Sequence, residues 1–154
     1  MPWPFSPGEI LTAANLNAVT VGPASTVWSS PINAGITIGN GSVTAFYYPA
    51  NAHLFAFFKF TFGSTSAVTG DVSLVLPVAS SISHAATGSG WYFDASAPSS
   101  SSPAFVLSTS TSTVILRGSV ASTTHTTNVV LSATVPFTWA TGDMIIANVH
   151  YLVA

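Results

Sequence analysis

Charged residues are nearly missing from this sequence. Two basic and four acidic residues occur among 154, so 4% of the chain is charged, whereas soluble domains usually carry about 25%. Charged side chains keep a protein surface hydrated and keep copies of the protein apart in solution. Because 48% of the residues are hydrophobic, the exterior needs another kind of cover. We infer that much of it contacts other protein in a permanent assembly, which indicates a building block and not a freely diffusing enzyme.

Four further absences exclude whole classes of protein. With two basic residues, the chain lacks the clustered Lys and Arg of a nucleic-acid site, so we expect no nucleic-acid partner. Without cysteine, it forms neither disulfides nor thiolate metal sites. A membrane-spanning helix needs about 20 apolar residues in a row, and the most apolar stretch, 52–62, is shorter and contains His53 and Lys59. The opening MPWPFSPGE also lacks the basic start and apolar block of a secretion signal. We therefore expect no membrane partner and synthesis in the cytoplasm.

Residues that carry catalysis in other proteins are few here and lie far apart. The four histidines form none of the short spacings typical of metal sites, and no serine lies in a GxSxG context. Asp71 and Asp143 follow glycine in predicted turns, where a carboxylate usually accepts backbone hydrogen bonds. A glycosidase pair formed by these two carboxylates is the alternative. The sequence predicts no catalytic residues, no metal and no cofactor, and we expect the protein not to be an enzyme.

The first 24 residues differ from the rest of the chain and are predicted to form a docking arm. Pro2, Pro4 and Pro7 favour an extended chain, because proline fixes its own φ and disfavours helix at the preceding residue. The segment LTAANLNAV then predicts one short helix with Thr12 as its N-cap. So short a segment does not fold alone, and its apolar side chains need a surface to lie on. The predicted docking residues are Trp3, Phe5, Ile10, Leu11 and Leu16.

From residue 25 to residue 154 the sequence predicts one all-β domain. Short runs rich in Val, Ile, Thr and aromatic residues alternate with clusters of Gly, Pro, Ser and Asn, and no long segment after Ala24 has a helical period. We predict a jelly-roll-like antiparallel β-sandwich of eight or nine strands, preceded by the extended arm with its short helix. Turns are expected at 39–41, 49–51, 69–71 and 141–143. Strands are expected near residues 36–38, 43–49, 52–62, 72–77, 90–94, 104–108, 112–118, 128–134 and 144–152.

Two of the predicted strands carry apolar side chains on both faces. In 52–62, every second residue from Leu54 to Phe62 is expected in the core, which leaves Phe55 and Phe57 on the face that should be polar. In the last strand, alternate residues from Ile145 to Val153 are expected inside, with Ile146 on the other face. Apolar residues on a solvent face indicate a second buried contact. We predict that Phe55, Phe57 and Ile146 form an oligomer interface; the alternative is that the arm of the same chain covers Phe55 and Phe57.

Two further regions are candidates for contact with other molecules. Asp94 follows Trp91 and Tyr92, and aromatic rings beside an acid form platforms for sugars, so these three residues are a candidate glycan contact. The alternative is structural, because Trp91 and Phe93 alternate as a pair of core residues would. The Ser-rich segment 96–102 is either a solvent-facing tip or a plain connector.

The N-terminal string PWPFSPGEILTAANLNAV resembles a segment at the start of tail and minor structural proteins of actinobacterial phages. Such segments open with aromatic residues and continue as G-E-V-L-T-A-A-D-L-N, which residues 8–17 match with Asn15 in place of the usual Asp. Asn15 weakens the interaction with the helix dipole but preserves the helix start. The rest of the chain is similar in style to the β-domains that follow this arm. The resemblance is specific for the arm and loose elsewhere.

This resemblance implies a structural protein of the virion, synthesised in the cytoplasm of the host. We expect a trimeric capsid decoration (minor capsid or cement) protein on the capsid exterior, anchored by its arm to the major capsid protein. The alternative is a tail location with tail proteins as partners, as a minor tail protein, a short tail fibre or a receptor-binding module for a host-surface glycan. Tail fibres of this style usually carry a shaft or further domains after the arm, and this sequence shows one compact domain, so we favour decoration.

Overall fold

The computed structural model describes residues 24–97, 102–121 and 124–154, and within these ranges the secondary structure is entirely β. Ten strands form, where eight or nine were predicted. Each strand pairs with its neighbours in antiparallel fashion. The strands are β1 (Thr26–Val27), β2 (Ile32–Thr37), β3 (Ser42–Ala50), β4 (His53–Thr61), β5 (Ala67–Val75), β6 (Thr87–Phe93), β7 (Ser102–Ser108), β8 (Thr113–Ala121), β9 (Thr126–Val130) and β10 (Met144–Leu152).

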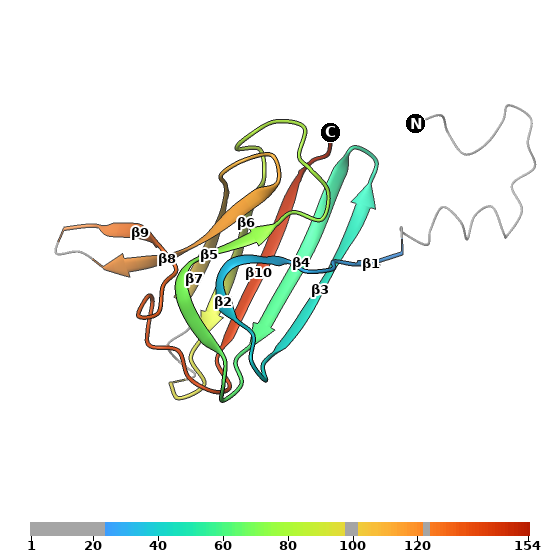
Figure 1. The fold of residues 1–154 in the computed structure, drawn as a ribbon. Helices are drawn as coiled ribbons and strands as arrows, with labels where there is room; N and C mark the ends of the chain where they lie inside the picture. Colours follow the sequence, from blue (N-terminus) through green and yellow to red (C-terminus); the bar gives the residue numbers. More distant parts are fainter. Residues whose placement is uncertain (1–23, 98–101, 122–123) are drawn as a thin grey trace, which may run out of the picture.

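All ten strands belong to one sheet that curls back on itself. Its order is β1-β3-β4-β10-β6-β7-β8-β5-β2, and β9 pairs with β8 outside that path. Figure 1 shows the two layers that result, with β3, β4 and β10 facing β2 and β5 across the interior. The predicted all-β, sandwich-like fold is confirmed, and a single continuous sheet supplies both layers. The β8–β9 hairpin projects away from the body (Figure 1).

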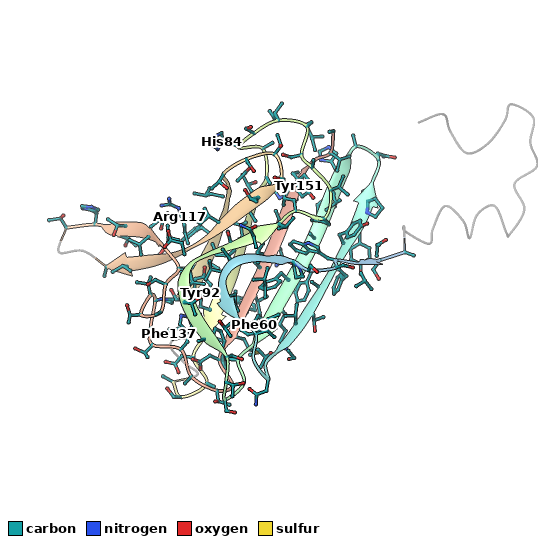
Figure 2. All side chains as sticks on the ribbon, in the orientation of Figure 1. Phe60, His84, Tyr92, Arg117, Phe137 and Tyr151 are labelled. Atoms are coloured by element: carbon teal, nitrogen blue, oxygen red, sulfur yellow. The ribbon has the colours of Figure 1, made fainter. Side chains whose placement is uncertain are left out.

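The core forms where alternate residues of β4 and β10 face the opposite layer. The alternation predicted for both strands is confirmed, because the residues expected inside are buried, apart from the half-buried Val153. Figure 2 shows Phe60 of β4 and Tyr92 of β6 pointing between the layers. The Tyr92 hydroxyl donates a hydrogen bond to the backbone oxygen of Arg117 at 3.0 Å, which satisfies its polar atom in the interior. The buried members of β4 and β10 are Leu54, Ala56, Phe58, Phe60, Ile145, Ala147, Val149 and Tyr151.

The segment between β1 and β2 closes the open side of the curled sheet. β1 pairs with β3 at one end of the strand order, and β2 pairs with β5 at the other. Trp28 joins the two edges: its backbone N–H donates to the oxygen of Ala45 at 3.1 Å, and its indole Nε1–H donates to the oxygen of Val75 at 2.9 Å. The indole is also buried. A single tryptophan therefore links the two layers at the seam.

Turn residues set most strand boundaries, although one predicted turn is wrong. Asn51 (φ 59°) lies in the tight turn between β3 and β4, and Gly142 (φ 92°) precedes β10, as predicted. The expected turn at 69–71 instead lies within β5. The pairing with β2 is irregular here, because residues 69–72 of β5 and only Gly35 of β2 lie between the pairs Ala34–Ser73 and Ile36–Val68. Gly35 (φ 82°) also lies so close to the Asp71 backbone that a Cβ would collide with it. The glycine-containing segment 69–71 therefore marks a bulge within β5 and not a turn.

Asp143 is a buried carboxylate that ties two turns together. Its Oδ1 accepts a hydrogen bond from the N–H of Ala95 at 2.9 Å, and its Oδ2 accepts one from the N–H of Ala140 at 2.6 Å. The predicted role of Asp143 as an acceptor of local backbone hydrogen bonds is confirmed. The bond to Ala95 adds a link to the segment after β6, which sequence spacing alone did not indicate.

Replacing Asp143 with Asn should lower the free energy of unfolding by about 2 kcal/mol, because the amide nitrogen cannot accept the second backbone hydrogen bond. Urea denaturation followed by tryptophan fluorescence measures the change. Asp71 is exposed and gives a matched control, and Asp71→Asn should shift stability by less than ~0.5 kcal/mol. Equal stability of Asp143→Asn and the unmodified protein would contradict the role assigned to this carboxylate.

Two buried tyrosines should make the fold sensitive to alkaline pH. Burial raises the pKa of Tyr92 well above its ordinary value of 10.0 and raises the pKa of Tyr151 to about 12. Above pH ~10 the unfolded chain has lost protons that the folded chain retains, so the free energy of unfolding falls as pH rises. For Tyr92 the slope approaches about 1.4 kcal/mol per pH unit. Urea denaturation between pH ~9 and ~11 should show this decline, and Tyr92→Phe should reduce it; an unchanged slope in that variant would contradict the assignment.

Candidate functional site

One face of the sheet carries apolar side chains that point away from the core. Residues opposite each other in an antiparallel pair share a face, and the register aligns Phe46, Phe57 and Asn148 across β3, β4 and β10. The same row continues through Ser89 of β6 to Phe105 of β7. We call this surface the outer aromatic face. Its apolar members include Phe46, Tyr48, Phe55, Phe57, Trp91, Phe105, Leu107, Ile146 and Leu152.

Aromatic contacts join several of these side chains on β3, β4 and β10. The rings of Phe46 and Phe57 stack with centroids 4.9 Å apart, and Phe46 meets Tyr48 edge to face at 5.5 Å. Phe55 stacks on the imidazole of His150 from β10 at 6.1 Å. Such pairs fix the rings relative to one another and favour one geometry of the face.

Much of the outer aromatic face is uncovered within the described part of the chain. The exposed fraction is 50% for Phe55 and 55% for Trp91. Tyr48, Leu107 and Leu152 are also exposed, whereas a monomeric protein rarely leaves a large contiguous apolar patch in water. The outer aromatic face therefore has the properties of a surface that another molecule covers.

A groove with a volume of about 480 Å³ crosses the outer aromatic face over β10. Large aromatic side chains from β3 and β4 line one side of the groove, whereas β6 contributes only small residues to the other side. The groove results from this difference in side-chain size. The side chains of Asn148 and His150 line the groove, and no hydrogen bond within the described ranges engages them. The groove is lined by Phe46, Tyr48, Phe55, Ala56, Phe57, Thr87, Gly88, Ser89, Asn148, Val149 and His150.

The outer aromatic face is almost uncharged. Two of the charged residues that the structure describes, Lys59 and Arg117, lie on this side of the sheet by their register with β10 and β7. Arg117 donates through Nη1 to the oxygen of Asn128 at 3.2 Å, which holds its guanidinium toward β9. Asp94 lies in the turn after β6, where the Ser96 hydroxyl is the main cause that lowers the pKa of its carboxyl. Few charges therefore oppose the approach of a second neutral surface.

The three residues predicted to form an oligomer interface lie together. In the ladder between β4 and β10, Phe55 is opposite His150, Phe57 is opposite Asn148, and Ile146 is opposite Lys59. Phe55 is half exposed, while Phe57 and Ile146 are half-buried. The structure thus places all three on the outer aromatic face. Their role as contacts between copies stays a prediction.

Sequence reasoning missed other members of this face. Phe46 and Tyr48 alternate with Val43, Ala45 and Tyr47 in the run SVTAFYY, so the alternation was visible. The missing information was the register, which sets Phe46 against Phe57 and Tyr48 against Phe55. A similar alternation in β7 places Phe105 and Leu107 on the same side.

The predicted glycan contact is not assembled as a single surface. Trp91 is exposed on the outer aromatic face, whereas Tyr92 points into the core and is fully buried. Asp94 accepts hydrogen bonds from the backbone N–H groups of Ser96 and Ala97 in a turn. Tyr92 is therefore wrong as a surface contact, because its ring fills the interior. The alternative that paired Trp91 with Phe93 in the core is also wrong, since Tyr92 is the inward residue.

The histidines do not converge on a common site. His84 lies in the loop before β6, where its Nδ1 is 2.9 Å from the oxygen of Ser108 (Figure 2). His125 contacts the neighbouring Thr124, and His150 stacks on Phe55. Within the described ranges, no group of three His, Cys, Asp or Glu side chains is placed to hold a metal ion.

Comparison with protein-family models, with curated proteins and with solved structures finds no match for this chain. No helix in the part of the chain that the structure describes is both long and apolar enough to cross a membrane. The predicted docking residues of the arm lie outside the described residues. They are Trp3, Phe5, Ile10, Leu11 and Leu16.

Proposed function

We propose that this protein is a non-enzymatic structural component of a phage virion, a trimeric decoration protein of the capsid. The outer aromatic face is the observation that carries the assembly role, because Phe55 and Trp91 are half exposed there and the whole sequence has only six charged residues. The resemblance of the N-terminal motif to structural proteins of actinobacterial phages supports a place in a virion.

Covering the outer aromatic face supplies enough free energy for association. A large aromatic side chain buries about 150–250 Å², so a half-exposed one has roughly 100 Å² left to bury, equivalent to about 2.5 kcal/mol. Phe55 and Trp91 are in this position, and Tyr48, Leu107 and Leu152 add to them. Their sum reaches the range of about 4–15 kcal/mol that association loses in translational and rotational freedom.

A closed ring of three copies explains how such a face avoids aggregation. When copies associate head to tail and the ring does not close, they form open fibres. In a closed cyclic oligomer, every copy of the apolar face is covered. Each trimer then presents three N-terminal arms to its neighbours. Three weak arms on one particle give tight retention, because the second and third bind at high effective concentration.

Imaging of the virion that contains this chain tests the proposal. We expect density for the curled sheet on the capsid exterior, with threefold symmetry, and a copy number in the hundreds by mass spectrometry of purified particles. Density on the tail with a handful of copies would support the minor tail protein and contradict decoration. Absence of the chain from purified particles would contradict a virion role altogether.

A further inference from the structure

We propose that the groove on the outer aromatic face binds the start of the N-terminal segment, residues 2–7, from a neighbouring copy of this chain. The inference rests on the proposed function, since it names the partner of the first part of the arm. It goes beyond that function because it assigns a ligand to the groove and divides the arm into two parts with different partners.

The chemistry of the groove suits a segment rich in proline and aromatic residues. Residues 2–7 read PWPFSP, and the prolines at positions 2, 4 and 7 favour the extended polyproline conformation. Aromatic-lined grooves bind such segments well, because the peptide is extended before binding and loses little conformational entropy. The rings of Phe46 and Phe57 offer stacking surfaces for Trp3 and Phe5.

The polar residues of the groove complement the backbone of such a segment. A polyproline backbone makes no internal hydrogen bonds, so its carbonyl oxygens need donors. The Asn148 amide lies in the groove, and Ser89 and Thr87 add hydroxyl groups on the β6 side. Residues 2–7 carry no charged side chain, and none of the groove residues is Asp, Glu, Lys or Arg. Segment and groove therefore match in polarity.

The direction of β1 is compatible with this docking. Thr26 and Val27 of β1 pair antiparallel with Tyr47 and Phe46, so β1 begins on the side of β3 that leads to Tyr48, which lines the groove. The residues between Pro7 and Ala24 reach at most about 55 Å when extended. A domain of this size has a radius of gyration of about 14 Å, so the groove of an adjacent copy lies within reach.

The length of the connection favours exchange between copies over docking in the same chain. β1 is separated from β10 by β3 and β4, a span of only about 14 Å at the usual strand spacing. Docking within one chain would leave most of the connecting residues slack. Docking in the groove of a neighbouring copy needs the length of this connection. It also lets the segment of one copy cover Phe55 and its neighbours in another. Ile10, Leu11 and Leu16 then remain to contact the virion neighbour.

Photo-crosslinking in the full chain tests this inference. Trp3 is replaced by p-benzoylphenylalanine in an unlabelled copy, which is mixed with a nitrogen-15 copy, irradiated and digested for mass spectrometry. We expect crosslinks from position 3 to peptides that contain residues 46–57 and 148–150, joining an unlabelled chain to a labelled one. Crosslinks to other surfaces, or to the groove within one chain only, would overturn the inference.

A variant that fills the groove supplies the matched control. Ser89→Trp places a large ring in the depression from an exposed strand position and should reduce the crosslink at least tenfold. Thr69→Trp makes a similar change at an exposed position of β5, on the opposite layer, and should leave the crosslink unchanged. An equal crosslink in both variants would overturn the inference. Crosslinks from position 3 to the groove would support the docking even if imaging placed the protein on the tail. Such a result would contradict only the proposed role on the capsid.

Discussion

Replacing Phe55 with Glu is expected to convert the oligomer into monomers. The Phe55 ring is half exposed and contacts the His150 imidazole on the surface of the sheet, so the substitution leaves the core residues in place. At a subunit interface the same substitution buries an unpaired carboxylate, with a penalty of several kcal/mol. A loss of about 3 kcal/mol raises the dissociation constant more than 100-fold. Sedimentation velocity measures the change in mass, and circular dichroism verifies that the strands persist.

The control for this prediction uses an exposed apolar residue away from the outer aromatic face. Val120 lies near the end of β8, on the hairpin that projects from the body (Figure 1). Val120→Glu should therefore keep the oligomer intact. An oligomer that survives Phe55→Glu while the fold is unchanged would show that another surface joins the copies.

Deleting residues 1–22 should reduce incorporation into particles at least tenfold while the sheet still folds. Every core residue that the structure describes lies at or after Trp28, so the deletion removes none of them. It removes all three arms of the proposed trimer, and linked binding of this kind strengthens retention by about 10²–10⁴-fold. The ratio of this chain to the major capsid protein, measured by mass spectrometry of purified virions, gives the effect.

Two point variants divide the roles of the arm. Leu11→Asp together with Leu16→Asp should lower incorporation and leave the oligomer intact, whereas Trp3→Ala should loosen the contact between copies. Full incorporation of the truncated protein would mean that the arm is not the anchor.

The core was predictable because its strands alternate with one unambiguous inner face. In β4 the inner positions run from Leu54 to Phe60 without a polar interruption, and the outer face contains His53 and Lys59. A period of two then assigns each side chain to the core or to the exterior. The same reasoning placed Ile145 inside and Ile146 outside in β10.

The outer aromatic face was only partly predictable, because alternation does not reveal which strands are neighbours. Phe46 joins Phe57 through the β3–β4 register, and Trp91 reaches the same face only because β6 pairs with β10. In β6 the aromatic run Trp91-Tyr92-Phe93 gives no polar side to identify the exterior. The strand faces inward with Gly88, Gly90 and Tyr92, and the two glycines leave room for the close approach of the β10 backbone.

The irregular segments also escaped the sequence reasoning. The two-residue strand β1 is too short for a pattern, and the β2–β5 pairing shifts register on both sides of Ala34, which breaks the alternation. Their placement depends on contacts distant in sequence, such as the indole of Trp28 bound to the oxygen of Val75. Such contacts join residues far apart in the chain, so the local amino-acid pattern does not indicate them.

Sedimentation equilibrium of the unmodified full chain tests the central claim most directly. A polypeptide with so few ionic groups and so apolar a face should sediment at micromolar concentration as one closed species with the mass of a trimer. A well-behaved single chain of 15.8 kDa under the same conditions would contradict the account.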